Sequence, residues 1–468
     1  MDADLLIIGL GIAGACAAIE AAEAGADVLV LERASAGGGT SALAEGVIYL
    51  GGGTRLQSDL GVADDPDALY AFMDACCGVG DKAVLRRFCD GAAAHFDWLE
   101  AHGVPFRREL YPDKHICPPN GPGLFSTGNE KVWPYRALAR PAYRGHLVDG
   151  PTGNAGSVMM AQLLARCTEL GVRVVGDARV TGLERDASGR VTGARYRSAG
   201  RDGVAWARKG VVVATGGFQM QREMVARDYA FLLDHGVAIG TDYSDGSGIA
   251  MAQALGADTE SIGAIHATAC FYPPSQLVKG VIVNRLGQRF VAEDSYHGRT
   301  AAFIFDQPDR KAWLVVDSAT FAYPELAQPF RYELVDGWET VAEMEAALAM
   351  PEGLLQGTLR DYNAFAREGR DPQFGKHPAW LQPLDQGPYA AFDLSADSVL
   401  YHYHSLGGLR VDADARVIGI DGAILPGLYA AGSCAANVIQ TAKGYGSGMT
   451  LAGGSFFGRV AAAYALSA

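Results

Sequence analysis

The sequence predicts an α/β protein (α+β overall) in which a Rossmann-like nucleotide-binding domain is interrupted by a second domain. Residues 4–33 have the pattern of a strand, a glycine-rich turn, a helix and a second strand, the unit that opens such folds. Residues 427–432 return to that pattern near the C-terminus, whereas residues 302–405 alternate strands with amphipathic helices. We therefore expect residues 1–268 and 405–468 to form the nucleotide-binding domain, with a capping, catalytic domain inserted at 269–404.

The opening unit predicts a dinucleotide site. An apolar run over 5–8 is typical of a buried parallel strand, and Gly9, Gly11 and Gly14 after it complete a G-x-G-x-x-G turn. Gly9 permits the tight turn, Gly11 lets a pyrophosphate approach the backbone, and Gly14 lets the helix pack on the strand. Glu32, at the tip of the second strand, can accept hydrogen bonds from ribose hydroxyls. Packing alone can also produce a glycine-rich turn, but the flanking elements favour nucleotide binding.

The residues after this unit favour FAD over NAD. Gly37-Gly38-Gly39-Thr40-Ser41 offers further backbone amides and two hydroxyls, as expected where a long flavin dinucleotide extends beyond its pyrophosphate. A second G-x-G-x-x-G with its own strand and helix is absent from the sequence. We therefore expect one dinucleotide site and an external electron acceptor.

Composition excludes several classes of function. A formal net charge of −14 over 468 residues disfavours nucleic acid and anionic lipid as partners. The eight cysteines show neither a C-x-x-C pair nor a zinc spacing, which predicts reduced thiols, no metal and a cytoplasmic location. The chain opens Met-Asp-Ala-Asp without a basic segment, and its long uncharged stretches are rich in Gly and Ser. We therefore expect neither a signal peptide nor a membrane-spanning helix.

The remaining elements follow in order. Residues 64–102 have helical periodicity, and 104–156 form a long loop rich in Gly, Pro and aromatics that could line a site or simply cover the surface. This loop carries a polar cluster at Ser126, Asn129, Glu130, Arg144 and His146. Further helices are expected at 157–171, 245–255, 344–355, 359–368 and 451–466, strands at 173–177, 178–184, 191–196 and 210–214, and a hairpin at 281–291 turning at Leu286-Gly287.

Motifs spread over nearly the whole chain resemble one family. They are the Gly9 fingerprint, ATGGF at 214–218, DGSG at 245–248, GQRFVAED at 287–294, SLGGL at 405–409 and GLYAAGS at 427–433. Together they resemble the FAD-dependent flavoproteins of the fumarate reductase and succinate dehydrogenase group. The resemblance implies a substrate held at the flavin between the two domains, and chemistry on a carbon–carbon bond next to a carbonyl or carboxylate.

The fingerprint and this resemblance predict the cofactor contacts. These are Gly9, Gly11, Ile12, Ala13, Gly14, Glu32, Arg33, Thr40, Ser41, Gly46, Val180, Gly216, Gly432, Gly448 and Leu451. The flavin-linking histidine of the respiratory members is absent from residues 41–53, so the resemblance implies non-covalent FAD.

Departures from the family pattern point away from a dicarboxylate substrate. Residues 317–321 lack the arginine that members of the group use as proton donor, and 444–448 replace the N-R-x-G-G context of a second arginine. Planar bidentate donors for a carboxylate are thus lost. His266 and His404 lie where members have substrate-binding histidines, although either could be structural.

Three hydroxyls stand where charges are lost. Tyr296, Tyr445 and Ser447 resemble the active-site triplet of 3-ketosteroid dehydrogenases of the Δ4-(5α) kind, because Tyr-Gly-Ser lacks the proline of the Δ1 kind. The resemblance implies desaturation of the C4–C5 bond of a 3-keto-5α-steroid, with the α-proton passing to a hydroxyl base and the β-hydride to flavin N5. We expect Tyr445 and Ser447 to form the proton relay and Tyr296 to donate to the ketone oxygen; the reverse assignment stays open.

Other functions remain compatible with the sequence. One is a Δ1-dehydrogenase. Another is a reductase of small enoates or dicarboxylates, which would need cationic anchors such as Arg299, Arg144, His266 or His404. A non-catalytic electron-transfer flavoprotein fits less well, because it would not need a capping domain rich in hydroxyls.

Overall fold

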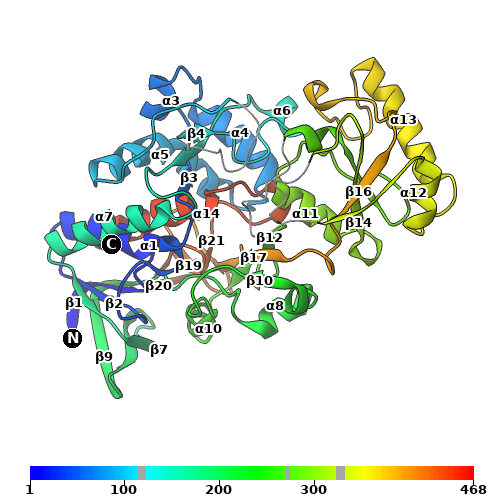
Figure 1. Cartoon of the computed structure of the whole chain (residues 1–468). Coiled ribbons are helices and arrows are strands. Elements are labelled where there is room, and N and C mark those ends of the chain that lie inside the picture. Colours follow the sequence, from blue (N-terminus) through cyan, green and yellow to red (C-terminus); the bar gives the residue numbers. More distant parts are fainter. Residues whose placement is uncertain (113–122, 270–274, 323–332, 468) are drawn as a thin grey trace.

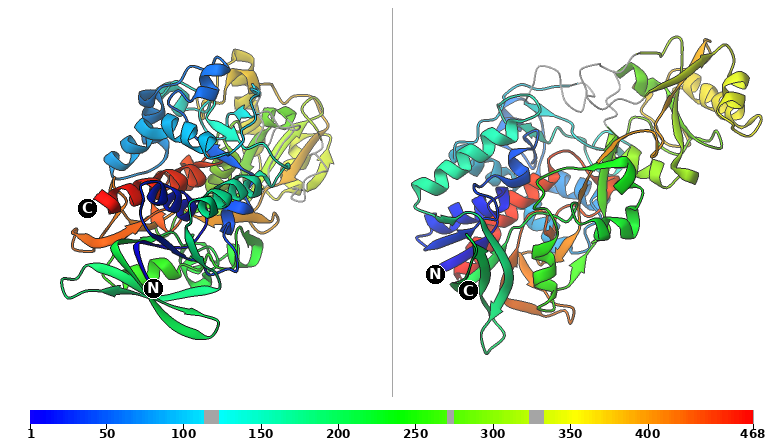
Figure 2. Two further views of the ribbon diagram at one scale, coloured as in Figure 1. Left: turned by 90° about the vertical axis from the view of Figure 1, so that its left-hand side faces the viewer. Right: turned by 60° about the horizontal axis from the view of Figure 1, so that its bottom comes forward.

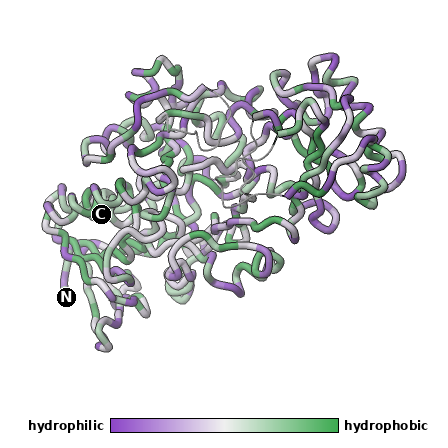
Figure 3. The backbone as a smooth tube through the Cα atoms, viewed as in Figure 1, coloured by the Kyte–Doolittle hydropathy of each residue, from purple (hydrophilic) through white to green (hydrophobic). Residues whose placement is uncertain are grey.

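The computed structural model describes residues 1–112, 123–269, 275–322 and 333–467. A large lobe contains both termini and the main sheet, and a smaller lobe with α12 and α13 projects to one side (Figures 1 and 2). Hydrophobic residues are concentrated where the strands and helices of the large lobe meet, and hydrophilic residues are frequent on the outer helices of the small lobe (Figure 3).

The main sheet has the order β19-β20-β9-β1-β2-β6, with a β7–β8 hairpin extending from β9. Strands β20, β9, β1, β2 and β6 run parallel, and Ile8 pairs with both Leu31 and Val213. The carboxyl ends of the central strands therefore meet at one edge, where open α/β sheets bind ligands. The bounds are β1 Asp2–Ile8, β2 Val28–Leu31, β6 Arg173–Val175, β7 Ala178–Arg185, β8 Val191–Ser198, β9 Arg201–Val213, β19 Arg416–Ile418 and β20 Ile424–Ala430.

Helix α1 (Ile12–Glu23) lies against α14 (Met449–Ser467) and α7 (Ala155–Glu169) on one face of this sheet. Small residues make the α1–α14 contact close, since a Cβ on Gly458 would lie 2.3 Å from the Ala13 carbonyl oxygen. The predicted helical stretch 64–102 forms α4 (Pro66–Cys76) and α5 (Lys82–Ala101), each capped by an aspartate.

Shorter elements complete the large lobe. They are α2 Gly39–Ala42, β3 Val47–Tyr49, α3 Arg55–Asp59, β4 Leu124–Phe125, α6 Tyr135–Leu138, β5 Gly145–Leu147, α8 Arg222–Tyr229, α9 Leu232–His235, α10 Ser247–Gln253, β11 Thr259–Glu260, β18 Gly408–Arg410, β21 Ala435–Ala436 and the 3₁₀ turn η4 Ala442–Gly444.

The small lobe is an antiparallel sheet of order β13-β14-β16-β15 packed against helices. Its strands are β13 Val281–Asn284, β14 Ala312–Asp317, β15 Leu334–Trp338 and β16 Tyr389–Asp393, and its helices are α11 His297–Phe305, α12 Val341–Ala347 and α13 Leu354–Glu368. The expected hairpin turn at Leu286-Gly287 is present, with Asn284 N–H donating to the Gln288 carbonyl at 2.9 Å, although the longer partner of β13 is β14.

The prediction of one helix over 344–355 is wrong. The chain leaves helical geometry at Ala349, whose φ is +53°, and Pro351 and the left-handed Gly353 follow before α13 begins at Leu354. Proline lacks the N–H that would continue the helix, so apolar periodicity is interrupted here by backbone constraints. Helix α13 also begins five residues earlier than expected.

A third sheet of order β10-β17-β12 connects the lobes. It consists of β10 Gly236–Ala238, β17 Tyr401–Ser405 and β12 Ile265–Ala269. The predicted domain boundaries at 268/269 and 404/405 fall inside β12 and β17, and the division into two domains stays a prediction.

Three expectations from the sequence can be compared with the described part of the chain. Its cysteines are all free and buried, while Cys117 and Cys270 lie outside the described residues. The described helices include none that is long and apolar enough to cross a bilayer. Among the same residues, no group of three or more His, Cys, Asp or Glu side chains could hold a metal ion.

Candidate active site

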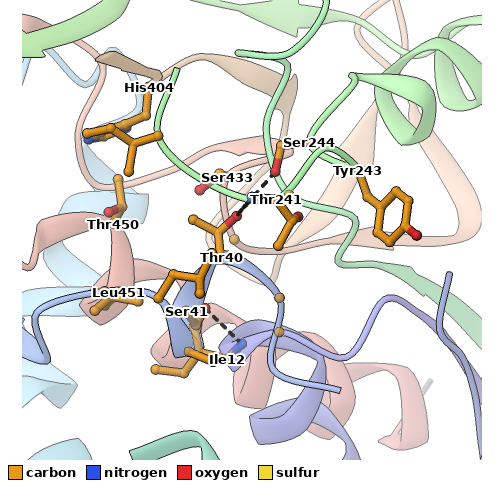
Figure 4. A pocket seen from close by; sticks show the side chains of 18 of the residues that line it. Ile12, Thr40, Ser41, Thr241, Tyr243, Ser244, His404, Ser433, Thr450 and Leu451 are labelled. Atoms are coloured by element: carbon orange, nitrogen blue, oxygen red, sulfur yellow. Dashed lines mark hydrogen bonds between the residues drawn. The ribbon is translucent and has the colours of Figure 1, made fainter. Parts of the chain in front are cut away.

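One cavity of about 950 Å³ runs along the carboxyl edge of the main sheet and onward to the β10-β17-β12 sheet. At one end it is lined by Glu32, Arg33 and Val180, and at the other by Tyr296 and Tyr445. Figure 4 shows part of its wall, where side chains from separate segments of the chain face the same space. Every predicted cofactor contact except Gly14 lines this cavity, as do Tyr296, Tyr445 and Ser447.

The three fingerprint glycines have different environments. Gly9 has φ +100°, and a Cβ there would lie 2.4 Å from the Ala214 carbonyl oxygen. A Cβ on Gly14 would lie 2.0 Å from the Gly9 carbonyl oxygen, so Gly14 serves helix packing and not the cavity wall. A Cβ on Gly11 would meet nothing closer than Ser41 Oγ at 3.6 Å. Gly11 therefore borders open space through which a ligand can approach the protein backbone.

The N-terminus of α1 could hold a pyrophosphate. Ile12 N–H donates to Ser41 Oγ at 3.2 Å, and α1 has no side-chain cap. The remaining N–H groups of its first turn have no acceptor within the helix, because the chain before them is not helical. These donors and the positive end of the helix dipole suit an anionic phosphate next to Gly11. The residues present thus fit a dinucleotide.

Glu32 has a structural role that the sequence did not indicate. Its carboxylate accepts hydrogen bonds from Leu10 N–H at 2.6 Å and Ala34 N–H at 2.8 Å, and the side chain is buried. It therefore fixes both chain segments at this end of the cavity. Each carboxylate oxygen retains further lone pairs with which a ribose hydroxyl could be bound.

Residues that the sequence did not reveal complete this half of the site. Thr40 Oγ1 accepts from Thr241 N–H at 3.1 Å and lies 3.3 Å from Ser244 Oγ (Figure 4). Arg33 bonds Asp245 at 2.6 Å and lies over the Tyr243 ring. The loop 239–244 carries no recognisable motif, so only the fold brings it to Thr40.

The other end of the cavity brings the three predicted hydroxyls together. Tyr296 is the residue before α11, whereas Tyr445 and Ser447 belong to the turn before α14. Tyr296 Oη lies 2.8 Å from Ser447 Oγ, and Tyr445 Oη lies 3.4 Å from Thr450 Oγ1. Ser447 thus pairs across the lobes with Tyr296, and Tyr445 is directed to the first turn of α14. This arrangement favours a Tyr296–Ser447 pair over the expected Tyr445–Ser447 relay, and the division of roles stays a prediction.

The rings that pack beside these hydroxyls are neutral, while Glu45 lines the same cavity and its charge adds to the raised pKa of Tyr445. The His266 ring stacks on Tyr445 with centroids 4.0 Å apart, and the His404 ring lies 5.2 Å from Tyr445. Burial lowers the pKa of His266 well below its usual value, with His404 and His297 adding to the effect, and burial also lowers the pKa of His404. Both imidazoles are therefore neutral near pH 7. Burial raises the pKa of Tyr445 to about 12, which keeps its phenol protonated.

Among the described residues, no arginine or lysine lines this end of the cavity. Arg299 donates to Tyr135 Oη at 2.7 Å and to the Lys443 carbonyl, and it does not line the cavity. Arg144 is fully buried in a pair with Asp64 at 2.9 Å, also outside the cavity. The arginines that do line the cavity in the described part of the chain, Arg33 and Arg179, adjoin Glu32 and Val180 at the opposite end.

Asn129 joins the two tyrosines. Its Oδ1 accepts from Tyr296 N–H at 3.1 Å, and its Nδ2 donates to the Tyr445 carbonyl at 3.4 Å. The neighbouring Thr127 carbonyl accepts from Ser447 N–H at 3.1 Å. Asn129 has no exposed surface. The loop 104–156, which the sequence left as a site or a surface loop, thus fixes the backbone of all three hydroxyl residues.

Comparisons with known proteins agree with this geometry. Residues 4–450 match the model of a family described as FAD binding domain. The chain is 30% identical to a 3-oxo-5-alpha-steroid 4-dehydrogenase of Comamonas testosteroni, over 92% of each chain. Its structure is similar to that of 3-ketosteroid-delta4-(5alpha)-dehydrogenase from Rhodococcus jostii RHA1, with a TM-score of 0.93 and 39% identity over 99% of this chain and 96% of that one.

A more distant similarity supports the fold alone. The 3-ketosteroid delta1-dehydrogenase of Sterolibacterium denitrificans has a TM-score of 0.70 and 21% identity over the full length of both chains. Fold and cavity define a flavoprotein oxidoreductase. The chain belongs to the FAD-binding family that it matches from residue 4 to 450 and binds FAD, which confirms the predicted fold class, cofactor and resemblance.

The open space beside Gly11 gives a test of cofactor placement. Gly11→Val should reduce the FAD content of purified protein at least tenfold, because the side chain enters the cavity and meets no protein atom closely. The measurement is flavin absorbance per mole of protein, with far-UV circular dichroism as the control for folding.

Gly337→Val is the matched control, since Gly337 lies on exposed β15 with no atom closer than 3.6 Å to the added Cβ. A folded Gly11→Val protein with full FAD content would mean that no phosphate passes this glycine.

The role of Asn129 can be tested without any assumption about substrate. Asn129→Leu leaves the Tyr296 N–H and the Tyr445 carbonyl without their partner, and we expect the free energy of unfolding to fall by about 1–3 kcal/mol. Denaturant titration measures this. Asn154→Leu, at an exposed position, should change it by less than about 0.5 kcal/mol. If the two substitutions changed the free energy of unfolding equally, the bridging role of Asn129 would be contradicted.

Proposed function

We propose that the protein is a 3-ketosteroid dehydrogenase that desaturates the C4–C5 bond of a 3-keto-5α-steroid. The observation that carries the proposal is the Tyr296–Ser447 hydroxyl pair, 2.8 Å across, which shares a cavity end with Tyr445 and, in the part of the chain that the structure describes, with no arginine. The Rhodococcus jostii enzyme at 39% identity is described in complex with 4-androstene-3,17-dione, which supports the same substrate class here. We also propose that FAD is bound without a covalent link and is reoxidised by an external acceptor.

The lining supports a neutral, apolar substrate. His266 and His404 are uncharged near pH 7 and so offer hydrogen bonds without a formal charge. Exposed apolar side chains also line the cavity, among them Val237, Ile239 and Leu400. A large ketone held mainly by buried apolar area suits such a wall. A dicarboxylate would instead leave its charges without partners, which disfavours the reductase alternative.

The arrangement favours the reverse of the roles expected from the sequence. Tyr445 stays protonated because of its raised pKa of about 12, so its hydroxyl suits donation to the ketone oxygen, where it stabilises developing enolate charge. Tyr296 and Ser447 then handle the α-proton. A phenol accepts a proton only as phenolate, and in that form Tyr296 would accept a hydrogen bond from the Ser447 hydroxyl 2.8 Å away.

The atoms of the reaction balance as follows. The α C–H bond breaks and its proton passes to the Tyr296 oxygen, the β C–H bond breaks with its electron pair, and the C4–C5 double bond forms. Bound FAD supplies the two-electron acceptor for the hydride. The backbones of Tyr296 and Tyr445 must keep their relative positions during this step. The two hydrogen bonds of Asn129 help to hold them there.

Single oxygen deletions test the mechanism. Tyr296→Phe, Tyr445→Phe and Ser447→Ala should each lower kcat on a saturated 3-keto-5α-steroid by about two to four orders of magnitude, the usual loss for an acid, base or oxyanion donor. Dye reduction measures kcat, and flavin absorbance reports folding. Tyr70→Phe, on α4 outside the cavity, controls for loss of a phenol oxygen.

The same preparation is assayed with fumarate and reduced viologen. Turnover of fumarate in place of the steroid would reject the dehydrogenase proposal, and more than about a tenth of wild-type kcat in all three variants would reject the hydroxyl mechanism.

A further inference from the structure

The polar cluster of the loop 104–156 lies next to the hydroxyl end of the cavity without lining it. Asn129, Glu130, Arg144 and His146 have no exposed surface, and none of the four belongs to the cavity wall. Apart from Asn129, the proposed reaction gives these residues no role. Buried charged groups are costly unless they are paired and hydrogen-bonded. The contacts of Glu130 and Arg144 therefore indicate what this cost supports.

A small sheet of order β3-β5-β4 holds the turn 445–448, which carries two of the three hydroxyls. At the end of β3, Tyr49 N–H donates to the Gly448 carbonyl at 3.2 Å. Two residues after β4, the Thr127 carbonyl accepts from Ser447 N–H at 3.1 Å. The turn is thus bonded from both outer strands of one sheet, with β5 between them.

The segment 127–129 lies directly against this turn. A Cβ on Gly128 would be 3.2 Å from Gly446 Cα, and a Cβ on Gly446 would be 3.3 Å from Gly128 Cα. The two backbones are therefore in contact, with no side chain between them. The carbonyl before Gly128 and the amide side chain after it bond the same turn. A displacement of this segment would consequently pass straight to the residues that carry the hydroxyls.

Glu130 holds the segment from outside the cavity. Its Oε2 accepts from Gly128 N–H at 3.1 Å. Burial raises the pKa of Glu130, whereas Arg144 and Tyr49 beside it act in the opposite direction. Arg144 is itself fixed, because its Nε and Nη2 donate to the Asp64 carboxylate at 3.0 and 2.9 Å. Glu130 therefore connects the segment 127–129 to an ion pair that is anchored in the large lobe.

We infer that Glu130 is a positioning residue: by fixing residues 127–129 it sets where Tyr445 and Ser447 point, without touching substrate or flavin. The catalytic consequence rests on the proposed function, whereas the effect on the turn does not. Misplacing a reacting group by ~1 Å can cost about 10²-fold in rate. A role exerted through position therefore lowers kcat, while the binding of a large apolar ligand changes little.

The test compares Glu130→Met with Glu130→Gln. Methionine is similar in size but offers no oxygen to Gly128 N–H, whereas glutamine keeps one. On a saturated 3-keto-5α-steroid, kcat should fall at least about tenfold in the methionine variant with KM within about threefold, and the glutamine variant should stay within about threefold of wild type. Flavin absorbance checks that FAD content is equal. Glu109→Met, exposed in the same loop and outside the cavity, is the matched control and should keep the wild-type kcat.

The position of the turn is also measured without substrate, by hydrogen–deuterium exchange of peptides that span residues 445–448. Glu130→Met should speed exchange there at least about fivefold, because the Ser447 N–H loses a fixed acceptor. The peptide containing β1 should keep its wild-type rate, since general destabilisation would speed both. Glu130→Gln and Glu109→Met should leave both rates unchanged.

The outcomes separate this role from the proposed function. If the wild type oxidises no 3-ketone, the proposed function fails, yet faster exchange confined to the turn in Glu130→Met and absent from Glu130→Gln still supports the positioning role. Unchanged kcat and exchange in Glu130→Met overturn the positioning role and leave the dehydrogenase proposal intact. Equal losses in the two variants, or faster exchange in the β1 peptide as well, also overturn it.

Gly128→Ala decides the matter if Glu130→Met does not fold. The backbone of Gly128 is outside the left-handed region, so alanine is tolerated there, but its Cβ presses on Gly446. We expect kcat to fall at least about fivefold at unchanged FAD content. A wild-type kcat in this variant would overturn the positioning role.

Discussion

The position of the cavity depends on close backbone contacts around α1. No side chain fits between Gly14 and the Gly9 carbonyl, or between Gly458 of α14 and the Ala13 carbonyl. These contacts hold the N-terminus of α1 at the edge where β1, β2 and β9 end. Because that terminus carries the free N–H donors, the position of the cofactor cavity depends on two glycines, Gly14 and Gly458, that do not themselves line it. The remaining lining is then recruited from loops that reach this edge.

The reacting end depends on a second constraint, the junction between the lobes. Tyr296 comes from the small lobe and Ser447 from the large one, so their 2.8 Å contact exists only while α11 lies against η4. Lys443 of η4 pairs with Asp306 at 2.6 Å, and Arg299 of α11 donates to the Lys443 carbonyl at 3.2 Å. These charged groups at the junction therefore take part in contacts that hold the lobes together. The hydroxyl groups are left as the chemically available ones inside the cavity.

Short sequence patterns predicted the elements whose geometry depends mainly on residues close together in the sequence. The apolar runs of β1 and β9 and the glycine fingerprint specify their own geometry, and they were predicted correctly. The helix expected over 344–355 failed because periodicity does not register the left-handed Ala349. The Tyr296–Ser447 contact was not predicted, because a spacing of two residues on a turn does not fix where each hydroxyl points. The contacts of Asn129 and Thr241 arise from pairing between distant segments, and one sequence carries no signal for such pairing.

The cavity separates charged from neutral recognition along its length. Arg33, Asp245 and Glu32 lie at one end, where a polar, partly solvated cofactor end can be bound, and the other end holds neutral imidazoles and hydroxyls. An arginine at the Tyr296–Tyr445 end of the cavity would stabilise a bound ligand only if that ligand were an anion. Facing an apolar ketone, it would be a buried cation without a partner, which is strongly unfavourable. The lack of arginine among the described residues at this end is therefore consistent with the neutral substrate that we propose. In the proposed mechanism, proton transfer then depends on a phenol, with Ser447 as its hydrogen-bond partner.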